Sequence, residues 1–416
     1  MKKEIFNNKV NSMSNYIMFE IKAKQIELTP MLKAKNRTPI ALSMGAPVEK
    51  VPDFVIEKTK EYLNVDSLHT YSTPKGETRF LEAVKYRMKK RFNVNLDEKK
   101  EIFSLIGSKE GISNFIRALV NYTDDVQNQD VIWVPAPGYA SYSQMIRMAG
   151  AKAYGIKLTK ENNYTPDLYT VYEEYIKEGL NPDKIKAIII NYPNNPLGCT
   201  CDLAYMQHCV DFCNEKGIVL ISDNAYCDMY YDEKYKPHSA LECKGGMDCC
   251  VEFYSLSKSY AMTGWRIGYA CGNSIGITML SRMKSTLDTG IFKVLQYASA
   301  DLLESEEGQK YIDNQNIMFK NKIQKFVDGL NSLGYKVEMP KTTFYLWVEI
   351  PERYENAKAF ADDLLETSGI VVVPGNAFAP WADRYLRLSV VAKDNDLEEV
   401  IRRMKTDGFY FEKQQV

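Results

Sequence analysis

One stretch of the chain combines a lysine, two serines and an arginine at spacings that suit a covalently held cofactor. It begins Ser255-Leu-Ser257-Lys258 and reaches Arg266 through a Thr-Gly-Trp sequence. A lysine amine can attack an electrophilic carbonyl, while serine hydroxyls and a guanidinium can bind a phosphate group. Pyridoxal phosphate carries both an aldehyde and a phosphate, so this stretch predicts a pyridoxal phosphate site with Lys258 as the attachment point.

An apolar run over residues 250–254 precedes this stretch and is typical of a buried strand. Lys258 is therefore expected just beyond a strand end, where open α/β sheets bind their ligands. Four other predicted strands also run into polar turns. Ser108 and Lys109 follow the strand at residues 102–106, and Tyr139 follows the strand at 131–134. Asn195 follows the strand at 186–191, and Asp223 and Tyr226 follow the strand at 218–222. Strands that alternate with helices predict a mainly parallel sheet, whose strand ends gather these side chains along one edge.

Each of these residue types has a use at a pyridoxal phosphate site. An aspartate such as Asp223 keeps the pyridine nitrogen protonated, so that the ring can accept the electrons of a carbanion. Tyr226 and Asn195 can donate hydrogen bonds to the ring oxygen, and the aromatic face of Tyr139 can stack on the ring. The Gly-Ser-Lys turn after residues 102–106 precedes a predicted helix, whose free N–H groups favour a phosphate.

The motifs resemble those of the class I and II pyridoxal phosphate-dependent aminotransferases, the aspartate aminotransferase-like superfamily of fold type I. Three motifs carry the resemblance: Asn195-Pro-Leu-Gly198, Asp223-Asn-Ala-Tyr226, and Ser255-Leu-Ser-Lys258 with Gly264-Trp-Arg266. Within this superfamily the chain resembles the LL-diaminopimelate aminotransferases. The stretches that support this are residues 91–97, 105–112, 191–196, 252–258 and 262–268.

The resemblance implies further roles for residues outside these motifs. Arg387, in Tyr385-Leu-Arg-Leu-Ser389, would clamp the α-carboxylate of the substrate, and Tyr16 and Gly45 would line the substrate side. Tyr71 would reach the cofactor phosphate of a neighbouring subunit. A homodimer with shared active sites is therefore expected.

Four residues depart from the family pattern. Leu197 stands where threonine is usual, Tyr254 where histidine is expected, and Ala379 where glycine is common. These three affect turn geometry and leave the chemistry alone. Phe292 occupies a place where a polar residue is expected, and this bears on specificity for diaminopimelate.

The expected fold class is α/β, that of fold type I transferases, with a large domain on the mainly parallel sheet and a smaller α+β domain. The expected boundaries are residues 1–49 for an N-terminal arm with part of the small domain, 50–295 for the large cofactor-binding domain, and 296–416 for the small C-terminal domain. A long helical region is expected over residues 278–332. Strands are expected near residues 335–339, 344–349, 371–373 and 385–391.

The composition is that of an ordinary globular protein, with 45% hydrophobic and 26% charged residues among 416. A formal net charge of −1 with both signs interspersed gives no support for nucleic acid or an anionic membrane as a partner. All nine cysteines lie between Cys199 and Cys271 without a Cys-x-x-Cys pair, so we expect buried reduced thiols and no metal site. The odd cysteine count and the lack of a secretory leader indicate the cytoplasm.

The expected reaction is a two-stage transamination from an amino acid to a 2-oxo acid, 2-oxoglutarate, with Lys258 as general base. LL-diaminopimelate is the donor that the resemblance suggests. Two alternatives stay open: a pyridoxal phosphate-dependent lyase or synthase of the same fold, and a pyridoxal phosphate-binding regulator, for which the chain has no room for a helix-turn-helix segment. Arg37, Arg147 and Arg282 are candidates for a second carboxylate clamp that the sequence does not place.

Overall fold

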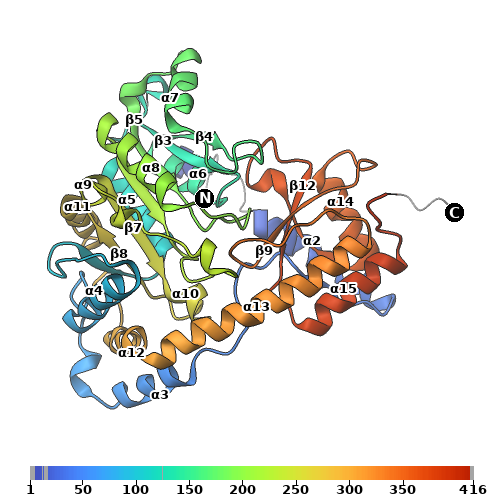
Figure 1. The fold of residues 1–416 in the computed structure, drawn as a ribbon, viewed down its shortest axis with the longest axis horizontal. Coiled ribbons are helices and arrows are strands. Elements are labelled where there is room, and N and C mark those ends of the chain that lie inside the picture. Colours follow the sequence, from blue (N-terminus) through green and yellow to red (C-terminus); the bar gives the residue numbers. More distant parts are fainter. Residues whose placement is uncertain (1–4, 12, 14–16, 124, 413–416) are drawn as a thin grey trace.

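A seven-stranded sheet forms the larger of two bodies in the computed structural model, which describes residues 5–11, 13, 17–123 and 125–412 (Figure 1). The strands lie in the order β2 (Ile102–Leu105), β8 (Gly268–Gly272), β7 (Cys250–Ser255), β6 (Val219–Asp223), β5 (Ile185–Ile190), β3 (Val131–Ala136), β4 (Lys152–Lys157). Neighbouring strands run parallel except at β8, which is antiparallel to both β2 and β7. The predicted mainly parallel sheet is therefore confirmed.

Helices cover both faces of this sheet, and a separate apolar core lies under each layer. One layer is formed by α5 (Ser108–Leu119), α6 (Tyr142–Ala149) and α11 (Ser274–Lys284). The other layer includes α4 (Thr78–Phe92), α8 (Leu203–Lys216) and α12 (Lys293–Glu304). Burial on both faces explains why β5 is a nearly continuous run of apolar residues, whereas the edge strand β4 is largely exposed.

The smaller body has an antiparallel sheet in the order β11 (Val373–Pro374), β12 (Tyr385–Ser389), β9 (Tyr345–Glu349). Its own apolar core packs this sheet against α13 (Glu306–Ser332), α14 (Ala357–Asp363) and α15 (Asp394–Thr406). The long helix α13 runs from beside the larger body to the smaller one (Figure 1).

The N-terminal segment joins the smaller body through a short parallel pairing. Strand β1 (Ile40–Ala41) pairs with β10 (Ile370–Val371), and the preceding helix α2 (Ile17–Ala34) packs its buried Leu32 against Val371. The backbone after β1 then continues toward the larger body, where α3 (Asp53–Tyr62) packs against α12. The chain therefore crosses between the two bodies at residues 42–52.

The remaining short elements connect these layers. They are α1 (Asn8–Asn11), α7 (Leu168–Lys177), α9 (Gly246–Cys249), α10 (Leu256–Ser259), η2 (Asp66–His69), η3 (Val126–Asn128), η4 (Pro182–Lys184), η5 (Glu233–Tyr235), η6 (Ala240–Glu242), the π-helical turn η7 (Leu364–Ser368) and η8 (Gly375–Ala377).

Some expected elements differ in the structure. The prediction of a strand near residues 335–339 is wrong. The side chain of Asn331 donates to the carbonyl of Val337 and accepts a hydrogen bond from its N–H, and so replaces a strand partner. The helical region over residues 278–332 is three helices, and the last begins where Ser305 caps α13 through the N–H of Gly308. Strands β4 and β8 and helix α7 were not among the expected elements.

The expected domain boundary at residue 296 falls inside α12. This helix packs against α3 and α4, and the Gln296 side chain donates to Ser72 Oγ at 2.9 Å and to the carbonyl of Ile291 at 2.8 Å. The contacts of α12 therefore lie with the larger body.

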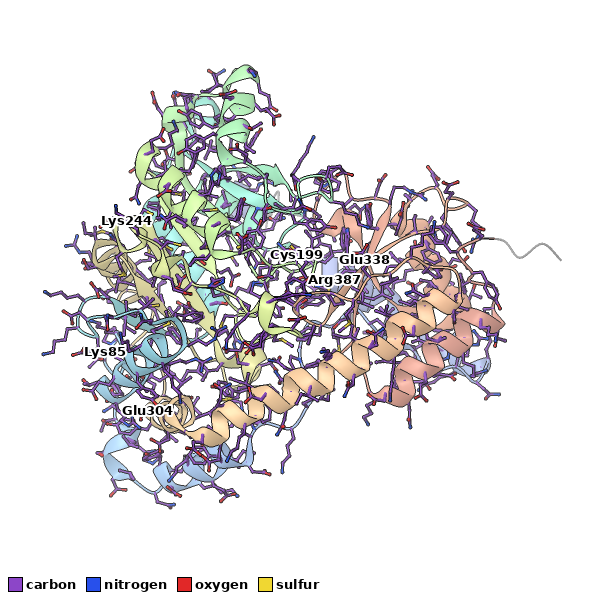
Figure 2. All side chains as sticks on the ribbon, in the orientation of Figure 1. Lys85, Cys199, Lys244, Glu304, Glu338 and Arg387 are labelled. Carbon is purple, nitrogen blue, oxygen red and sulfur yellow. The ribbon has the colours of Figure 1, made fainter. Side chains whose placement is uncertain are left out.

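All nine cysteine thiols are buried. Cys199, labelled in Figure 2, accepts a hydrogen bond at its carbonyl from Thr342 Oγ1 at 3.2 Å. In the described part of the chain, no three His, Cys, Asp or Glu side chains are grouped to hold a metal ion. None of the described helices has the length and apolar composition needed to cross a bilayer.

Candidate active site

A cavity of about 730 Å³ lies where the strand ends of the large sheet face the smaller body. Twelve of the residues predicted from the sequence line it: Gly45, Ser108, Lys109, Tyr139, Asn195, Asp223, Tyr226, Ser255, Ser257, Lys258, Arg266 and Arg387. Tyr71 is not in this lining and its side chain is 85% exposed. Tyr16 lies outside the described residues.

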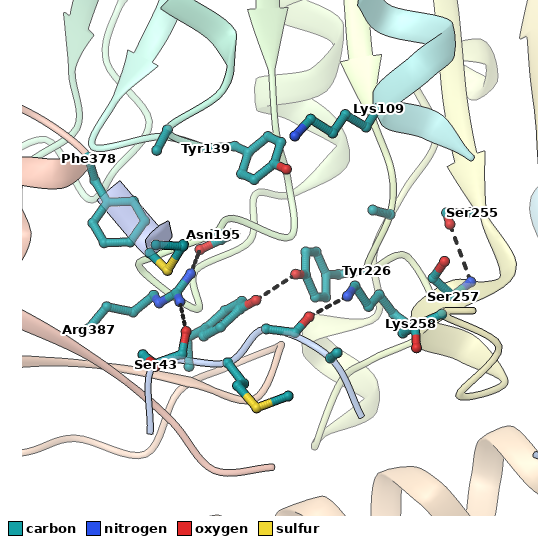
Figure 3. A pocket seen from close by; sticks show the side chains of 18 of the residues that line it. Ser43, Lys109, Tyr139, Asn195, Tyr226, Ser255, Ser257, Lys258, Phe378 and Arg387 are labelled. Carbon is teal, nitrogen blue, oxygen red and sulfur yellow. Dashed lines mark hydrogen bonds between the residues drawn. The ribbon is translucent and has the colours of Figure 1, made fainter. Parts of the chain in front are cut away.

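Lys258 is held on the one-turn helix α10, which follows β7 directly. Its Nζ donates a hydrogen bond to the carbonyl of Gly45 (Figure 3). Gly45 is required there, because an added Cβ would lie 2.3 Å from the hydroxyl of Tyr345. Behind the lysine, Gln315 of α13 donates to the carbonyl of Lys258 at 2.9 Å. The backbone of Lys258 is therefore fixed while its amine faces the cavity.

The surroundings of Lys258 favour the neutral amine. Burial lowers the pKa of the lysine to about 8, and the guanidinium groups of Arg387 and Arg266 lower it in the same direction. The carboxylate of Asp223 opposes this shift. A buried amine with a pKa near neutrality can serve as both nucleophile and proton carrier.

Asp223 ends strand β6 with its carboxylate buried. Its Oδ2 accepts a hydrogen bond from the hydroxyl of Tyr142 at 2.6 Å, and its carbonyl accepts one from Asn191 at 2.9 Å. Its Oδ1 has no partner among the described residues. Burial raises the pKa of Asp223 to about 6, although the hydrogen bond from Tyr142 and the charge of Lys258 act against this. The carboxylate is thus aimed at a ligand group that can donate a proton or hydrogen bond.

Arg387 lies in the middle of β12, only 4% exposed. It donates to the carbonyl of Ser43 at 2.6 Å and to Oδ1 of Asn195 at 3.1 Å (Figure 3). Its guanidinium also lies 4.5 Å from the ring centre of Tyr345 and 5.0 Å from that of Phe378. A planar cation held on several sides in a cavity is suited to bind a carboxylate with two hydrogen bonds.

The polar groups near the start of α5 form an anion-binding cradle. Gly107 precedes this helix with a φ of 119°, and a Cβ there would lie 2.6 Å from Nη2 of Arg266. Ser255 Oγ accepts a hydrogen bond from the N–H of Ser257 at 3.2 Å, while the buried Ser257 Oγ has no partner among the described residues. Helix N–H groups, a guanidinium and hydroxyls therefore converge where a phosphate can be bound.

Several residues that line the cavity or support its side chains were not predicted from the sequence. Tyr345, on β9, shares a hydrogen bond of 2.8 Å with the hydroxyl of Tyr226, and Tyr142 is the partner of Asp223. The α2 side chains were also missed as a wall of the site. Tyr345 lies within β9, and Tyr142 is the first residue of α6, so each is hard to distinguish in the sequence from a core aromatic residue.

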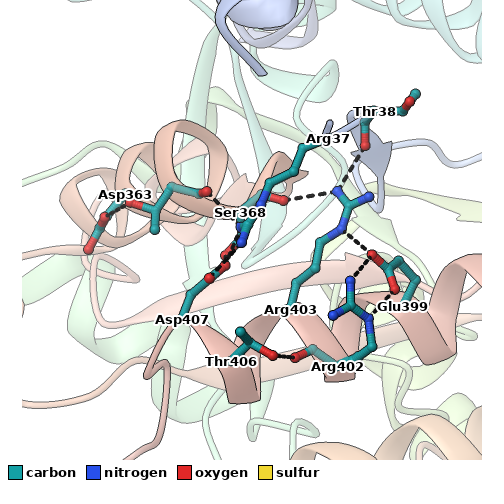
Figure 4. A network of polar contacts seen from close by, with 10 residues as sticks. Arg37, Thr38, Asp363, Ser368, Glu399, Arg402, Arg403, Thr406 and Asp407 are labelled. Carbon is teal, nitrogen blue, oxygen red and sulfur yellow. Dashed lines mark hydrogen bonds and ion pairs between the residues drawn. The ribbon is translucent and has the colours of Figure 1, made fainter. Parts of the chain in front are cut away.

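The structure places the three unassigned arginines away from the cavity lining. Arg37 forms an ion pair with Asp407, with Nη2 and Oδ1 2.7 Å apart, within a polar network that includes Ser368 (Figure 4). Arg147 and Arg282 lie on α6 and α11. None of the three lines the cavity among the described residues.

Comparison with known proteins decides the family. Residues 37–404 match the family model described as aminotransferase class I and II. The chain belongs to this family. The family uses pyridoxal phosphate, and the protein is accordingly a pyridoxal phosphate-dependent aminotransferase.

Curated relatives of the aminotransferase share about a third of its sequence. It is 36% identical over 409 residues to LL-diaminopimelate aminotransferase 2 of Nostoc sp., covering 98% of this chain and 99% of the relative. It is 35% identical over 373 residues to LL-diaminopimelate aminotransferase of Desulforudis audaxviator, covering 90% and 91%.

Solved structures resemble the aminotransferase over nearly its full length. Substrate-bound BacF from Bacillus subtilis aligns with a TM-score of 0.88 at 30% identity, covering 98% of each chain. Aspartate aminotransferase from Thermus thermophilus aligns with a TM-score of 0.86 at 24% identity, covering 98% of this chain and all of the other, and supports the fold.

The lowered pKa of Lys258 predicts how fast the cofactor-free aminotransferase captures pyridoxal phosphate. Only the neutral amine attacks an aldehyde, so the rate should rise about tenfold per pH unit up to about pH 8 and level off above it. Stopped-flow absorbance between pH 6 and pH 10 measures this profile. Because the charge of Arg387 lowers the pKa of Lys258, the R387M variant should level off at a higher pH. A rate that rises steadily to pH 10 in the unsubstituted protein contradicts the prediction.

Proposed function

We propose that this aminotransferase transfers an amino group from an L-amino acid to 2-oxoglutarate, and that LL-diaminopimelate is a donor. One observation carries the first part: the half-buried Lys258, the buried Asp223 and the fixed Arg387 face one cavity. The names of the relatives described above support the choice of donor.

The residues present fit pyridoxal phosphate. Buried Asp223 Oδ1 and Ser257 Oγ have no hydrogen-bond partner among the described residues, and their chemistry suits a ring N–H and a phosphate oxygen. The close approach of the Arg266 guanidinium to the backbone of Gly107 places a cation beside the start of α5, which suits the same phosphate. The residues that would hold the cofactor are Ser108, Lys109, Tyr139, Asn195, Asp223, Tyr226, Ser255, Ser257, Lys258 and Arg266, with Tyr71 from a second subunit.

The bound cofactor supplies an aldehyde that takes up the amino group and a ring that accepts electrons from the Cα–H bond. Lys258 Nζ takes the proton from the Cα atom of the amino acid and delivers it again during the return reaction, which its pKa of about 8 permits. Asp223 stabilises a proton on the nitrogen that it faces. Arg387 holds the α-carboxylate so that the Cα–H bond lies within reach of Lys258.

An absorbance titration tests the proposed reaction. The purified holoenzyme is mixed with single amino acids in the absence of any oxo acid: LL-diaminopimelate, glutamate, aspartate, lysine and phenylalanine. Conversion of the cofactor to pyridoxamine phosphate by diaminopimelate and by glutamate supports the proposal. Conversion only by other amino acids contradicts the proposal that diaminopimelate is a donor. Release of ammonia or a thiol without uptake of an oxo acid indicates a lyase and contradicts transamination.

We further propose a homodimer with shared sites, supported by the large exposed aromatic side chain of Tyr71. The expected mass in light scattering is twice 47.7 kDa. Y71F should weaken cofactor binding about tenfold, because a hydrogen bond to a charged phosphate is lost. Y86F, at a tyrosine on α4 that is 43% exposed, is the matched control and should bind the cofactor normally. A fully active monomer contradicts the shared site.

A further inference from the structure

One wall of the cavity comes from helix α2, which belongs to the N-terminal segment. Three apolar side chains of this helix line the cavity, Met18, Phe19 and Ile21, together with Lys22 and Gln25. Neither the proposed transamination chemistry nor the cofactor cradle uses any of these residues. They lie in the same cavity as Arg387, which is assigned above to the substrate α-carboxylate, and are available to contact the rest of the substrate.

Lys22 differs from its neighbour Lys24 in how its charge is compensated. Lys24 forms ion pairs with Asp362 at 2.7 Å and with Glu366 at 2.9 Å, which fasten α2 to the smaller body. Lys22 donates instead to Oε1 of Gln25 at 3.1 Å, a neutral partner, and makes no ion pair with a described carboxylate. A full positive charge on the cavity wall is therefore left for a ligand.

The charges lining the cavity select the chemistry of that ligand. Among the described residues that line it, Asp223 is the only carboxylate, and one of its oxygens already accepts a hydrogen bond from Tyr142. Five lining residues have basic side chains: Lys22, Lys109, Lys258, Arg266 and Arg387. Lys109 lies in the first turn of α5 beside the phosphate cradle, which leaves Lys22 as the cation on the apolar wall.

We propose that Lys22 binds the distal carboxylate of the substrate, so that the enzyme prefers amino acids and 2-oxo acids whose side chains end in a carboxylate. This rests on the proposed transamination and on Arg387 as the α-carboxylate clamp. The methylene groups between the two carboxylates pack against Met18, Phe19 and Ile21. Lys22 is thus a specificity-determining residue, and dicarboxylic substrates bridge from β12 to α2.

Two amino acids of matched shape test the proposal. L-Glutamate and L-norvaline have side chains of similar length, and only glutamate carries the distal carboxylate. In the holoenzyme, K22Q should lower kcat/KM for glutamate about tenfold through a higher KM with kcat retained, because a charge-assisted hydrogen bond made before the chemical step is lost. The value for norvaline should stay unchanged. K33Q, which removes an exposed lysine in the last turn of the same helix, is the matched control and should change neither.

A charge reversal and a binding measurement complete the test. K22E should lower kcat/KM for glutamate further than K22Q does. It should raise kcat/KM for L-ornithine, whose side chain ends in an ammonium group. Calorimetric binding of glutarate to the holoenzyme should weaken about tenfold in K22Q, while binding of pentanoate, which has one carboxylate, should not change.

The possible failures are distinguishable. If unsubstituted enzyme converts glutamate but K22Q alters glutamate and norvaline equally, or alters neither, the role of Lys22 is overturned and transamination stands. If unsubstituted enzyme converts neither amino acid, the proposed function fails and the role of Lys22 fails with it.

Discussion

K258A should reduce turnover about 10⁴-fold, the upper range expected when a positioned acid–base group is removed. The structure explains this size of effect, since Lys258 carries the amine with a pKa near 8 that faces Asp223 and Arg387 in the cavity. K258R should be equally inactive, because a guanidinium keeps its proton and cannot act as a base. Single-turnover measurements with glutamate quantify both variants. Activity of K258A close to that of the unsubstituted enzyme would falsify the assignment.

The same substitution should leave the cofactor-free fold intact and make it more stable. Because burial lowers the pKa of Lys258 from 10.5 to about 8, folding is disfavoured by about 3 kcal/mol at pH 7 through this group. The unfolded chain binds the proton more tightly, so the cost is full below pH 8 and disappears as the pH rises toward 10.5. The gain in melting temperature of K258A should shrink over that interval. K177A, at a largely exposed lysine of α7, is the matched control and should change neither activity nor stability.

D228N should have the largest effect on stability, a loss of about 3–5 kcal/mol in the free energy of unfolding. Asp228 is buried, and its Oδ2 accepts hydrogen bonds from Arg87 at 2.5 Å and from Ser259 at 2.6 Å. The substitution would leave the guanidinium of Arg87, on α4, buried without its counter-charge. Urea unfolding followed by circular dichroism measures the loss.

Two comparisons separate the buried pair from surface charges. E57Q, which breaks the exposed pair of Lys60 and Glu57, should change stability by less than about 1 kcal/mol. The double variant R87M/D228L should recover most of the loss, because no unpaired charge stays buried. If D228N is as stable as E57Q, the importance of the buried pair is refuted.

Acid should destabilise the protein through the same residue. Burial alone would raise the pKa of Asp228, but the charges of Arg87 and Arg91 outweigh burial and hold that pKa below its ordinary value of 3.8. The pair therefore contributes to the free energy of unfolding at any pH above the pKa that Asp228 has in the unfolded chain. This contribution is lost as the pH falls through the lower pKa that Asp228 has in the folded protein.

The cavity could be largely predicted from the sequence because its chemistry follows strand ends. Asp223 and Lys258 each come directly after an apolar run, and a parallel sheet brings such positions to one edge whatever the packing of its faces. The roles of Arg387 and Gly45 were predicted from the family resemblance alone. Arg387 lies on the smaller body, and Gly45 lies on the segment that joins the smaller body to the larger one. Their distance from the lysine depends on how the two bodies meet.

Other features depend on contacts that leave no local pattern. The apolar spacing over residues 335–339 is typical of a strand, yet Asn331 takes the hydrogen bonds that a partner strand would supply. Lys22 and Lys24 look alike in sequence, and only the positions of Asp362 and Glu366 in the folded chain distinguish them. Specificity residues of this kind are set by tertiary structure.

The contact between Gln315 and the carbonyl of Lys258 has a mechanical consequence. Gln315 lies on α13, the helix that carries the smaller body, and its neighbour Asn316 donates to the carbonyl of Asp228 at 2.8 Å. The helix is thus pinned to the floor of the cavity at one point along its length. A rotation of the smaller body about this contact would leave Lys258 in place. It would change the distance between the guanidinium of Arg387 and the lysine.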